Sequence, residues 1–399
     1  MLRDASVRVS AHEQVVSEGL VKIVVPRLEL YMRSDGSLEP AWMPVFYNPA
    51  AVVSRDLTIA VLKAFYGSRD IAFIEPLAGT GVRGIRIAVE KGGWGILNDV
   101  DPRALYYMSR NIELNNLSPE KIEVYSQEAN SLLNNATFTG IAFDYIDLDP
   151  YGSPTPFIDS AFKPLARSAL IGISATDTAP LTCSHSRKAL RRYWIRCLDV
   201  DFEKELGMRL LTAYIARRAA ALDTAVKPLV AFMHRHYYRL FFKTTRNAEE
   251  AYRLIDECIG YIWYCPSTLE RGFARKPEEA ESRICLNGGK PVLLEGVWIC
   301  SLGDKAFINS VKSEVENTWW FSRETRKLIN IISDEVEVNN PYVRIDKLCS
   351  ILKKSMPKYE VIIERLRELG VKATRTHFDP RGLRVNSDVG VLYEVLKHL

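Results

Sequence analysis

The sequence predicts a doubly wound, Rossmann-like α/β fold, followed by a smaller C-terminal α+β domain. Three observations predict it. From residue 70 to about 247, short apolar strands alternate with helices, as in a parallel sheet that helices cover on both faces. A glycine-rich turn joins the first of these strands to its helix. Farther along, helical patterns dominate and the alternation stops, which predicts two domains, 1–247 and 248–399.

The composition is that of a globular protein with a sizeable core. The chain has 399 residues, of which 47% are hydrophobic and 26% charged, and its net charge is +4. This weak basicity does not by itself indicate a nucleic-acid partner. The sequence contains no apolar run of membrane-spanning length, and its N-terminal stretch lacks the apolar segment of a secretory signal. The seven cysteines are scattered and odd in number, which predicts reduced thiols in a cytoplasmic protein.

The elements of the first domain follow from local patterns. Residues 19–34 alternate loosely between apolar and charged side chains, as in a hairpin or an edge strand. Asp56 is placed to cap a helix over 57–65. Helices over 81–92 and 101–116 separate the first strands of the sheet. The strands themselves are expected at 71–77, 94–100, 121–128, 143–149, 169–177 and, as a hairpin, 227–245.

The second domain is predicted from a change of pattern near residue 248. Residues 246–265 have the pattern of one helix, and a glycine-rich irregular stretch continues to about residue 306. Short strands are expected within 373–385, close to the end of the chain. Further helices are expected over 318–336, 344–355 and 358–370.

The glycine-rich turn indicates a cofactor site. Gly79, Gly81 and Gly84 fit the pattern G-x-G-x-x-G between a strand and a helix. Glycines let the backbone approach a ligand closely, and the helix that follows offers unbonded N–H groups at its start. Alone, the pattern is often just a tight turn. Its position between a strand and a helix favours a nucleotide-type cofactor.

Two acids decide which cofactor is favoured. Asp99 ends the next strand, where a carboxylate binds the ribose hydroxyls of either NAD or S-adenosylmethionine; its alternative role is to cap the following helix. Glu75 stands four residues before Gly79, a position characteristic of methyltransferases. A cationic sulfonium tolerates a nearby acid better than a pyrophosphate does. The pair therefore favours S-adenosylmethionine and a class I methyltransferase domain.

The fourth strand ends in Asp149-Pro150-Tyr151-Gly152, which predicts the reaction site. Ligands of doubly wound sheets bind outside the carboxyl ends of the strands. An exocyclic base amine is a poor nucleophile because its lone pair is delocalised, so acceptors on its N–H groups assist attack. Asp149 and the Pro150 carbonyl are candidate acceptors, and Tyr151 offers a ring for stacking. The alternative is a plain turn capped by Asp149. Asp147 is expected to be structural only.

These motifs resemble the tRNA (guanine-26, N2)-dimethyltransferase family, especially its archaeal members. The similarity runs in order along about residues 18–399. Its most specific match is DLDPYGSP, which is close to the family's DLDPFGSP. EPLAGTGVRGIR, NDVDPRA, TDTAPL and TRTHFDPRG match further family segments. Ser54 replaces the asparagine that is usual in the family's FYNP…NRD segment.

The resemblance implies a fuller set of site residues. Phe46 and Arg55 would contact the cofactor, Arg55 through the methionine carboxylate, while Asp99 would hold the ribose. Glu128, where the family usually has Asp, would accept from the adenine amino group. The implied cofactor set is Phe46, Arg55, Glu75, Ala78, Gly79, Asp99, Val100, Glu128 and Ala129, and the catalytic set is Asp149, Pro150 and Tyr151.

Cysteines mark a departure from that family. Many of its members carry paired CxxC motifs in the C-terminal half, whereas Cys265, Cys285 and Cys300 are single and widely spaced here. The sequence therefore predicts no structural zinc. Cys183 is expected to be a packed thiol and not a nucleophile, because the proposed chemistry needs no covalent intermediate.

Two basic stretches are candidates for binding RNA. Residues 186–197 interleave basic side chains with Tyr193 and Trp194, and residues 353–384 are a second stretch. Phosphates require such cations, and exposed bases stack on such rings, although either stretch alone is equally compatible with a solvated helix face. Beside a site for methylating a base amine, the two together favour RNA. N2 of guanine lies on its pairing edge, so the base must leave its pair to react.

The sequence thus predicts an S-adenosylmethionine-dependent enzyme that methylates N2 of guanine-26 in tRNA, twice. It is expected to be a cytoplasmic monomer that binds tRNA through its C-terminal domain, with no membrane and no metal. Two alternatives stay open. One is a DNA amino-methyltransferase, since Asp-Pro-aromatic loops also methylate adenine or cytosine, and the other is a catalytically silent RNA-binding protein. An NAD dehydrogenase is disfavoured, because no residue set is arranged for hydride transfer.

Overall fold

The computed structural model describes residues 9–399, which form two compact units. Most of the N-terminal stretch on which the expectation about a secretory signal rests lies outside these residues. No helix within the described part of the chain is long and apolar enough to cross a membrane. The predicted division at residue 247 stays a prediction. From residue 9 on, the first unit contains residues up to 150, 159–173 and 310–327, and the second contains 151–158, 174–309 and 328–399.

A seven-stranded sheet has the strand order β5-β4-β3-β6-β7-β9-β8. Its strands are β3 (Ile71–Glu75), β4 (Gly93–Asn98), β5 (Ile122–Tyr125), β6 (Phe143–Leu148), β7 (Leu165–Ala175), β8 (Thr224–His234) and β9 (Tyr237–Arg246). Strands β3 to β7 pair in parallel, and β8 and β9 form an antiparallel hairpin. Strand β3 lies between β4 and β6, so the winding reverses there. Ligands bind at the carboxyl edge of such a point. The doubly wound class is confirmed.

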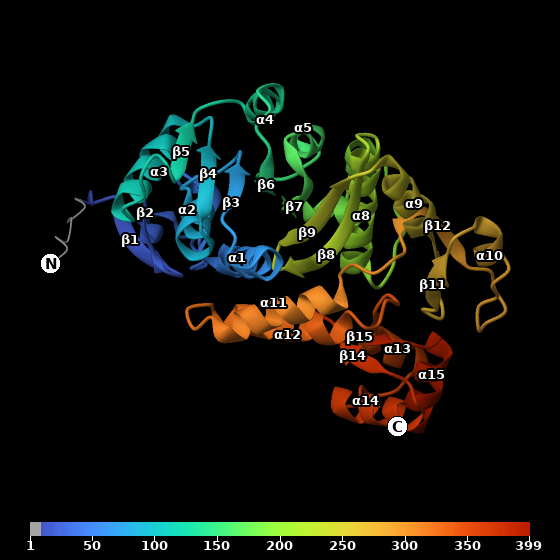
Figure 1. Ribbon diagram of the computed structural model, residues 1–399. Helices are drawn as coiled ribbons and strands as arrows, with labels where there is room; N and C mark the ends of the chain where they lie inside the picture. The colour runs from blue at the N-terminus through green and yellow to red at the C-terminus, as the bar shows by residue number, and fades with distance from the viewer. Residues whose placement is uncertain (1–8) are drawn as a thin grey trace. The chain divides into compact units, whose positions relative to one another are not determined.

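Helices separate the parallel strands, as predicted. Figure 1 shows β3, β4 and β5 side by side, with α3 next to β5. Helix α2 continues as a π-helical turn, Ile87–Lys91. The helices here are α1 (Val52–Tyr66), α2 (Val82–Arg86), α3 (Pro102–Leu114), α4 (Ala129–Phe138) and α5 (Ile158–Phe162).

The N-terminal hairpin forms earlier in the chain than predicted. Its strands are β1 (Glu13–Glu18) and β2 (Val21–Pro26), which pair antiparallel around a turn that contains Gly19. Pro26 ends the second strand because it lacks an N–H for the ladder. The residues that follow form short 3₁₀ turns, namely Leu28–Tyr31, Pro40–Trp42 and Pro49–Ala51.

Asp56 does not cap a helix, which corrects the prediction. Helix α1 already begins at Val52, so Asp56 lies inside it and is only 1% exposed. Its carboxylate pairs with Arg86 at 2.8 Å and accepts from Ser322 N–H at 2.9 Å and Thr325 Oγ1 at 2.8 Å. A local capping pattern does not reveal partners that lie far away in the sequence.

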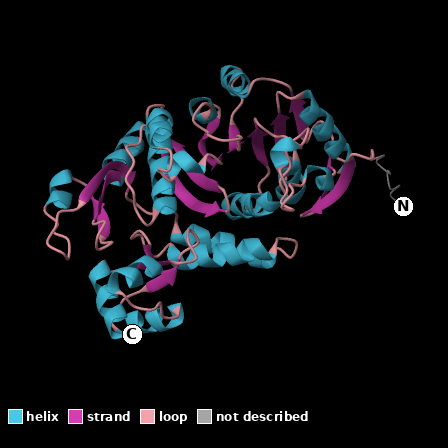
Figure 2. Ribbon diagram, turned by 180° about the vertical axis from the view of Figure 1, so that it is seen from behind, coloured by secondary structure: helices cyan, strands magenta, loops and turns pink. Residues whose placement is uncertain are grey.

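The second unit contains the remaining helices and two small antiparallel sheets, β11-β10-β12 and β13-β15-β14. Figure 2 shows several helices and a short strand close to the C-terminus. Helices α11 and α12 contribute residues to both units. The helices are α6 (Thr178–Leu181), α7 (Ser186–Tyr193), α8 (Glu203–Ala220), α9 (Ala248–Cys258), α10 (Pro277–Glu281), α11 (Lys305–Asn317), α12 (Arg323–Glu335), α13 (Ile345–Leu352), α14 (Tyr359–Glu368) and α15 (Val389–His398). The strands are β10 (Ile259–Tyr264), β11 (Arg271–Ala274), β12 (Val292–Trp298), β13 (Val343–Arg344), β14 (Ala373–Arg375) and β15 (Gly382–Val385).

The helix predicted over 246–265 is only half right. Helix α9 ends at Cys258, and the chain continues as β10, the central strand of its sheet. The sequence Ile-Gly-Tyr-Ile-Trp-Tyr is rich in aromatic and β-branched side chains, which fit a pleated sheet better than a helix. Strand pairs on both edges of β10 decide the outcome.

Part of the second basic stretch is buried. Arg384 is 4% exposed and pairs with Glu205 at 3.0 Å and Glu335 at 3.1 Å. Glu335 also contacts His377, and Glu205 pairs with Arg209 at 2.9 Å. Arg384 therefore stabilises the interior of the second unit and is not available to a phosphate. Fewer residues of the predicted RNA-binding stretch 353–384 can thus contact RNA than the sequence predicts.

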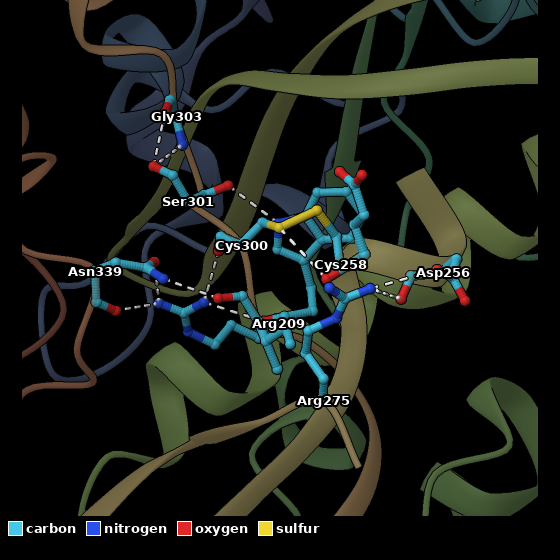
Figure 3. The surroundings of a disulfide bond; sticks show 11 residues. Arg209, Asp256, Cys258, Arg275, Cys300, Ser301, Gly303 and Asn339 are labelled. Carbon is cyan, nitrogen blue, oxygen red and sulfur yellow. Dashed lines mark hydrogen bonds and ion pairs between the residues drawn. A yellow bond between two sulfur atoms is a disulfide. The ribbon is translucent and has the colours of Figure 1, made fainter. Parts of the chain in front are cut away.

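Two disulfides correct the expectation of reduced thiols. Cys258 bonds Cys300, and Cys265 bonds Cys285; these sequence separations are 42 and 20 residues. Arg209 donates to the carbonyl oxygens of Cys300 and Asn339, beside the first disulfide, at 3.0 and 2.8 Å (Figure 3). Scattered spacing could not indicate the pairs, because the strands that align them are far apart in sequence.

The second disulfide involves cysteines that could otherwise bind a metal ion. Cys265 and Cys285 lie close to Glu270, and the three could group around a metal ion only with both sulfurs reduced. The disulfide and such a site are mutually exclusive, and the absence of zinc stays a prediction.

The disulfides should stabilise the fold measurably. In the chain-entropy account, closing loops of these lengths contributes about 3–4 kcal/mol each. Without reductant, we expect the melting temperature of the Cys258→Ala/Cys300→Ala variant to lie well below that of the native chain. The control Cys197→Ser removes a thiol outside both bonds, and its melting temperature should stay close to the native value. Thiol titration of the denatured native chain should give three groups before reduction and seven after. Seven groups before reduction would contradict the pairing.

Candidate active site

The glycine turn has the geometry of a ligand cradle. Gly79 and Gly81 have φ values of +54° and +76°, which favour glycine. A Cβ on Gly79 would lie 3.3 Å from the Phe46 carbonyl oxygen, so the loop with Phe46 lies against the turn. A Cβ on Gly84 would lie 2.1 Å from Leu97 Cδ2, so the third glycine lets α2 pack on β4. The backbone conformation thus favours glycine at positions 79 and 81, and close packing requires it at position 84.

Asp99 lies beside this turn at the end of β4. Its Oδ2 accepts from Gly79 N–H at 3.0 Å, and its Oδ1 accepts from Asp101 N–H at 3.1 Å. The cap of α3 is Asp101, which accepts from Arg103 N–H at 2.9 Å. Asp99 is therefore not the helix cap, and its partly exposed carboxylate has lone pairs left for hydroxyl groups.

Arg83 joins three acids at the switch point between β3 and β6. Its Nε lies 3.4 Å from Glu75 Oε1 and 3.3 Å from Asp147 Oδ1, and its Nη2 bonds Asp149 Oδ2. The Arg83 side chain is only 4% exposed, whereas that of Asp149 is 31% exposed. The guanidinium therefore holds one oxygen of Asp149 from below while the carboxylate reaches the surface of the unit.

Helix α1 supports the same guanidinium. Arg83 Nη1 donates to Ser54 Oγ at 3.2 Å and to Thr58 Oγ1 at 2.9 Å. Ser54 is one of the positions where the sequence departs from the resembled family, and its hydroxyl supports Arg83 here. Burial lowers the pKa of Arg83, but Asp147, Asp149 and Glu75 outweigh it and raise that pKa above its usual value. Arg83 remains charged.

Glu75 is buried beneath the glycine turn. One carboxylate oxygen accepts from Gly84 N–H at 3.0 Å, and the side chain is 5% exposed. Burial raises the pKa of Glu75 to about 8; Arg83 opposes this shift, and Asp147 and Asp149 add to it. Glu75 is thus mostly protonated at neutral pH. The structure gives it a role in supporting the turn, and its contact with a cofactor stays a prediction.

Arg55 is already paired within the first unit. Its Nε and Nη2 bond Glu18 at 2.5 and 2.6 Å, and Nη2 also donates to Asn48 O at 3.1 Å. Glu18 also pairs with Arg86 at 3.1 Å. No acceptor among the described residues bonds Nη1 of Arg55. A contact to a cofactor carboxylate through that atom stays a prediction.

The other predicted cofactor residues differ in exposure. Ala78 and Ala129 are 7% and 4% exposed, whereas Phe46 and Val100 are 48% and 67% exposed. Glu128 caps α4 by accepting from Asn130 N–H at 3.0 Å and Ser131 N–H at 2.9 Å. Its carboxylate is therefore partly used, which leaves fewer lone pairs for an adenine amino group.

Asp149 and Pro150 belong to the first unit, and Tyr151 belongs to the second. Pro150 is buried, and Tyr151 is 80% exposed. Gly152 has φ +93°, donates its N–H to Thr176 Oγ1 at 2.7 Å and accepts from Thr176 N–H at 2.8 Å. The loop after Pro150 is held by its backbone, while the Tyr151 ring faces solvent.

The residues present fit S-adenosylmethionine. The turn offers a backbone that comes close to a ligand, Asp99 offers carboxylate oxygens, and the mixed set of acids suits a cation better than a pyrophosphate. Sequence reasoning missed Arg83 and Glu18, which fix these parts. A signal for Arg83 is present in the sequence: it is a charged residue in the first turn of a helix between buried apolar residues.

The family model for N2,N2-dimethylguanosine tRNA methyltransferases matches residues 22–397. The chain belongs to this family. A family relative, the tRNA (guanine(26)-N(2))-dimethyltransferase of Aeropyrum pernix, is 35% identical, with 96% of this chain and 97% of the relative covered. The tRNA (guanine(26)-N(2)/guanine(27)-N(2))-dimethyltransferase of Aquifex aeolicus is 32% identical, with 94% and 93% covered. The resemblance inferred from the motifs is confirmed.

The fold of the family is also shared with a solved structure. Trm1 from Pyrococcus horikoshii, in complex with S-adenosyl-L-methionine, has a TM-score of 0.81 and 30% identity to this chain. The match covers 96% of this chain and 99% of that one. The methyltransferase domain and the smaller C-terminal domain of this family member are confirmed by that similarity.

The proton on Glu75 gives a pH test. Because its pKa is about 8 in the folded chain and near 4.5 when unfolded, the folded state binds the proton more tightly. This contribution to stability is full below about pH 4.5 and is lost progressively as the pH rises to about 8. Glu75→Gln imitates the protonated acid and does not lose this stability. As the pH rises across this range, its melting temperature should therefore increase by several degrees relative to that of the native chain. The exposed control Glu120→Gln should not, and parallel pH slopes for Glu75→Gln and native would refute the assignment.

Proposed function

We propose that this chain is an S-adenosylmethionine-dependent tRNA methyltransferase that places two methyl groups on N2 of guanine-26. Its Aeropyrum pernix relative bears that activity by name, and the Pyrococcus horikoshii Trm1 structure holds S-adenosyl-L-methionine. The observation that carries the proposal is the bond from Arg83 to Asp149 at the switch point of the sheet. Neither DNA methylation nor silent RNA binding is favoured by the family.

Asp149 acts as an acceptor for the base amine. Arg83 occupies its Oδ2, so Oδ1 is the oxygen presented to an N–H of guanine N2. The Pro150 carbonyl is the second acceptor, and proline has no N–H to compete. Both acceptors stabilise the positive charge that develops as the nitrogen attacks.

S-adenosylmethionine supplies a methyl group made electrophilic by its sulfonium. The N2 lone pair forms the new N–C bond while the C–S bond breaks, and Asp149 takes the amine proton or passes it to water. A monomethylated amine keeps one N–H, so one of the two acceptors still suffices for the second transfer. This makes double methylation compatible with the same pair.

The base must leave the tRNA stack to reach this pair. The exposed Tyr151 ring, directly after Pro150, receives the guanine by stacking. Phe46, which is 48% exposed, is a further candidate ring beside the glycine turn. The unpairing costs a few kcal/mol, and contacts in the pocket offset it.

The cofactor contacts are assigned from position and chemistry. Asp99 holds the ribose hydroxyls, and the Ala78–Gly79 backbone lies beneath the amino-acid part. Arg55 reaches the methionine carboxylate through Nη1. Glu128 and the Ala129 segment face the adenine, with Val100 alongside. Glu75 holds the turn in place.

The remaining assignments concern partners and place. We assign residues 248–399 to binding the tRNA body, with the exposed lysines of 353–384 on phosphates. The enzyme works as a cytoplasmic monomer without a metal. Disulfides are compatible with a cytoplasm in hyperthermophiles, whose intracellular proteins are often rich in them.

Asp149 can be tested directly. Asp149→Ala should lower the single-turnover rate of methyl transfer to tRNA by roughly 100- to 1,000-fold, the loss seen when a group stabilising transition-state charge is removed. Its S-adenosylmethionine affinity, measured by calorimetry, should stay close to native. Asp70→Ala is the control, because Asp70 is an acid of the first unit that is 68% exposed and lies outside the Arg83 cluster, so its turnover should stay near native. Near-native turnover of Asp149→Ala would overturn the acceptor role.

The methylated position is the test of the substrate. After reaction with bulk tRNA, nuclease digestion and mass spectrometry should place N2,N2-dimethylguanosine at position 26. A tRNA with adenosine at 26 should gain no methyl group there. Dimethylguanosine at position 27 as well would indicate the broader activity named for the Aquifex aeolicus relative, and methylated DNA bases instead would refute the proposal.

A further inference from the structure

Resting on the proposed function, we propose that one face of α7 and its end is a contact surface for the tRNA around the target guanine. This α7 surface consists of Arg187, Arg191, Trp194 and Arg196. We further propose that the hydroxyl of Tyr193 couples this surface to the loop that follows Pro150. Both proposals concern residues of the second unit.

The spacing places the surface on one side of the helix. Arg187, Arg191 and Trp194 are separated by four and three residues, so they share a face, while Ala189 and Tyr193 point inward and are 0% and 2% exposed. Arg187, Arg191 and Trp194 are all exposed. The helix is therefore divided into a cationic, aromatic outer face and a packed inner face.

The cations of this surface are not neutralised within residues 9–399. Arg187, Arg191 and Arg196 form no ion pair with any described residue, in contrast to Arg192, which pairs with Asp177 at 2.8 Å. Unpaired arginines held on one rigid helix face suit a polyanion, because each phosphate contact releases counterions. A protein partner would require acidic complementarity, whereas the substrate already supplies phosphates.

Trp194 is exposed at a defined place. It is 68% exposed, and its backbone is left-handed with φ +57°, an uncommon conformation for a bulky residue. Tyr214 meets its ring edge-on at a centroid distance of 6.2 Å, and the Arg218 guanidinium lies 6.0 Å from the ring centre. The ring is oriented by its neighbours without being covered, which is the arrangement needed to stack on an unpaired base.

The inner face joins the helix to the loop after Pro150. Tyr193 Oη donates to Asp177 Oδ1 at 2.6 Å and lies 2.7 Å from Ser153 Oγ. Ser153 belongs to the same loop as Tyr151, and Gly152 is bonded to Thr176, the neighbour of Asp177. When RNA holds α7 in place, these hydrogen bonds would therefore also hold the loop that contains Tyr151.

Two free thiols flank α7: Cys183 precedes the helix and Cys197 follows it. Burial raises the pKa of Cys183 to about 12, and Cys197 adds to this shift, so Cys183 stays a thiol. Cys183 is partly buried, and its role as a packed thiol stays a prediction.

The surface is tested by the salt dependence of tRNA binding. Arg187→Ala and Arg191→Ala should each lower the slope of log K against log salt by about 1, because each removes one phosphate contact. Arg167→Ala is the matched control, because this arginine of β7 is also exposed and forms no ion pair among the described residues, and it lies outside both α7 and residues 248–399. Native slopes for Arg187→Ala and Arg191→Ala would overturn the proposal and leave α7 a solvated face.

Trp194 is tested by substitution. Trp194→Ala should weaken tRNA binding roughly tenfold at fixed salt without changing the salt slope, and Trp194→Phe should restore most of it, because a stacking ring is uncharged. Equal affinities for native and Trp194→Ala would contradict the stacking role. S-adenosylmethionine binding should be native in both variants, and a loss there would show misfolding of the site and count against the assignment.

Tyr193→Phe tests the coupling. It keeps the packed ring but removes the hydroxyl that joins Asp177 and Ser153. We expect near-native tRNA affinity but a single-turnover rate lowered about tenfold at saturating tRNA, since the loop is then less well placed. A weaker affinity with an unchanged rate would contradict a positioning role. Because tRNA binding is measured without turnover, failure of the α7 surface and failure of the proposed methyl transfer give different results.

Discussion

The site depends on one buried guanidinium. Arg83 meets Glu75, Asp147 and Asp149 at the carboxyl ends of β3 and β6, and α1 supplies two hydroxyls to the same group. Three acids with one buried cation would carry excess negative charge, and the raised pKa of Glu75 relieves it by keeping a proton. Removing the guanidinium would leave these carboxylates uncompensated in a dry interior, which is strongly destabilising. The same interaction therefore holds the fold at the switch point and orients the acceptor.

A second chain of buried charges supports the cofactor side of the first unit. Asp56 binds Thr325 and Arg86, Arg86 binds Glu18, and Glu18 binds Arg55. Thr325 and its neighbours come from the C-terminal part of the sequence but belong to this unit. The loop with the predicted cofactor contacts is thus supported by a segment some 270 residues further along the chain. A change in that segment can reach the cofactor residues without touching them.

The sequence was informative where a local pattern reflects a local cause. Gly79, Asp99 and Asp149 could be placed because strand ends and glycine turns have fixed geometry in doubly wound sheets. The local pattern predicts a cap at Asp56 and a helix through β10, and both predictions are wrong because partners elsewhere in the sequence decide the structure. The same reason hides the disulfides, since only the folded sheet brings Cys258 to Cys300. The glycine pattern does not mark Arg83, because the buried acids that need its charge are spread over two strands.

The central claim is that Arg83 presents Asp149 to the base amine, and Arg83→Lys tests it most directly. Lysine keeps the charge, so the chain should fold and bind S-adenosylmethionine with near-native affinity, but its single ammonium cannot reach Asp149, Ser54 and Thr58 together. We predict a single-turnover rate of methyl transfer to tRNA about 10- to 100-fold below native, as expected when a reacting group is misplaced. A native rate in a folded, cofactor-binding Arg83→Lys variant would contradict the account.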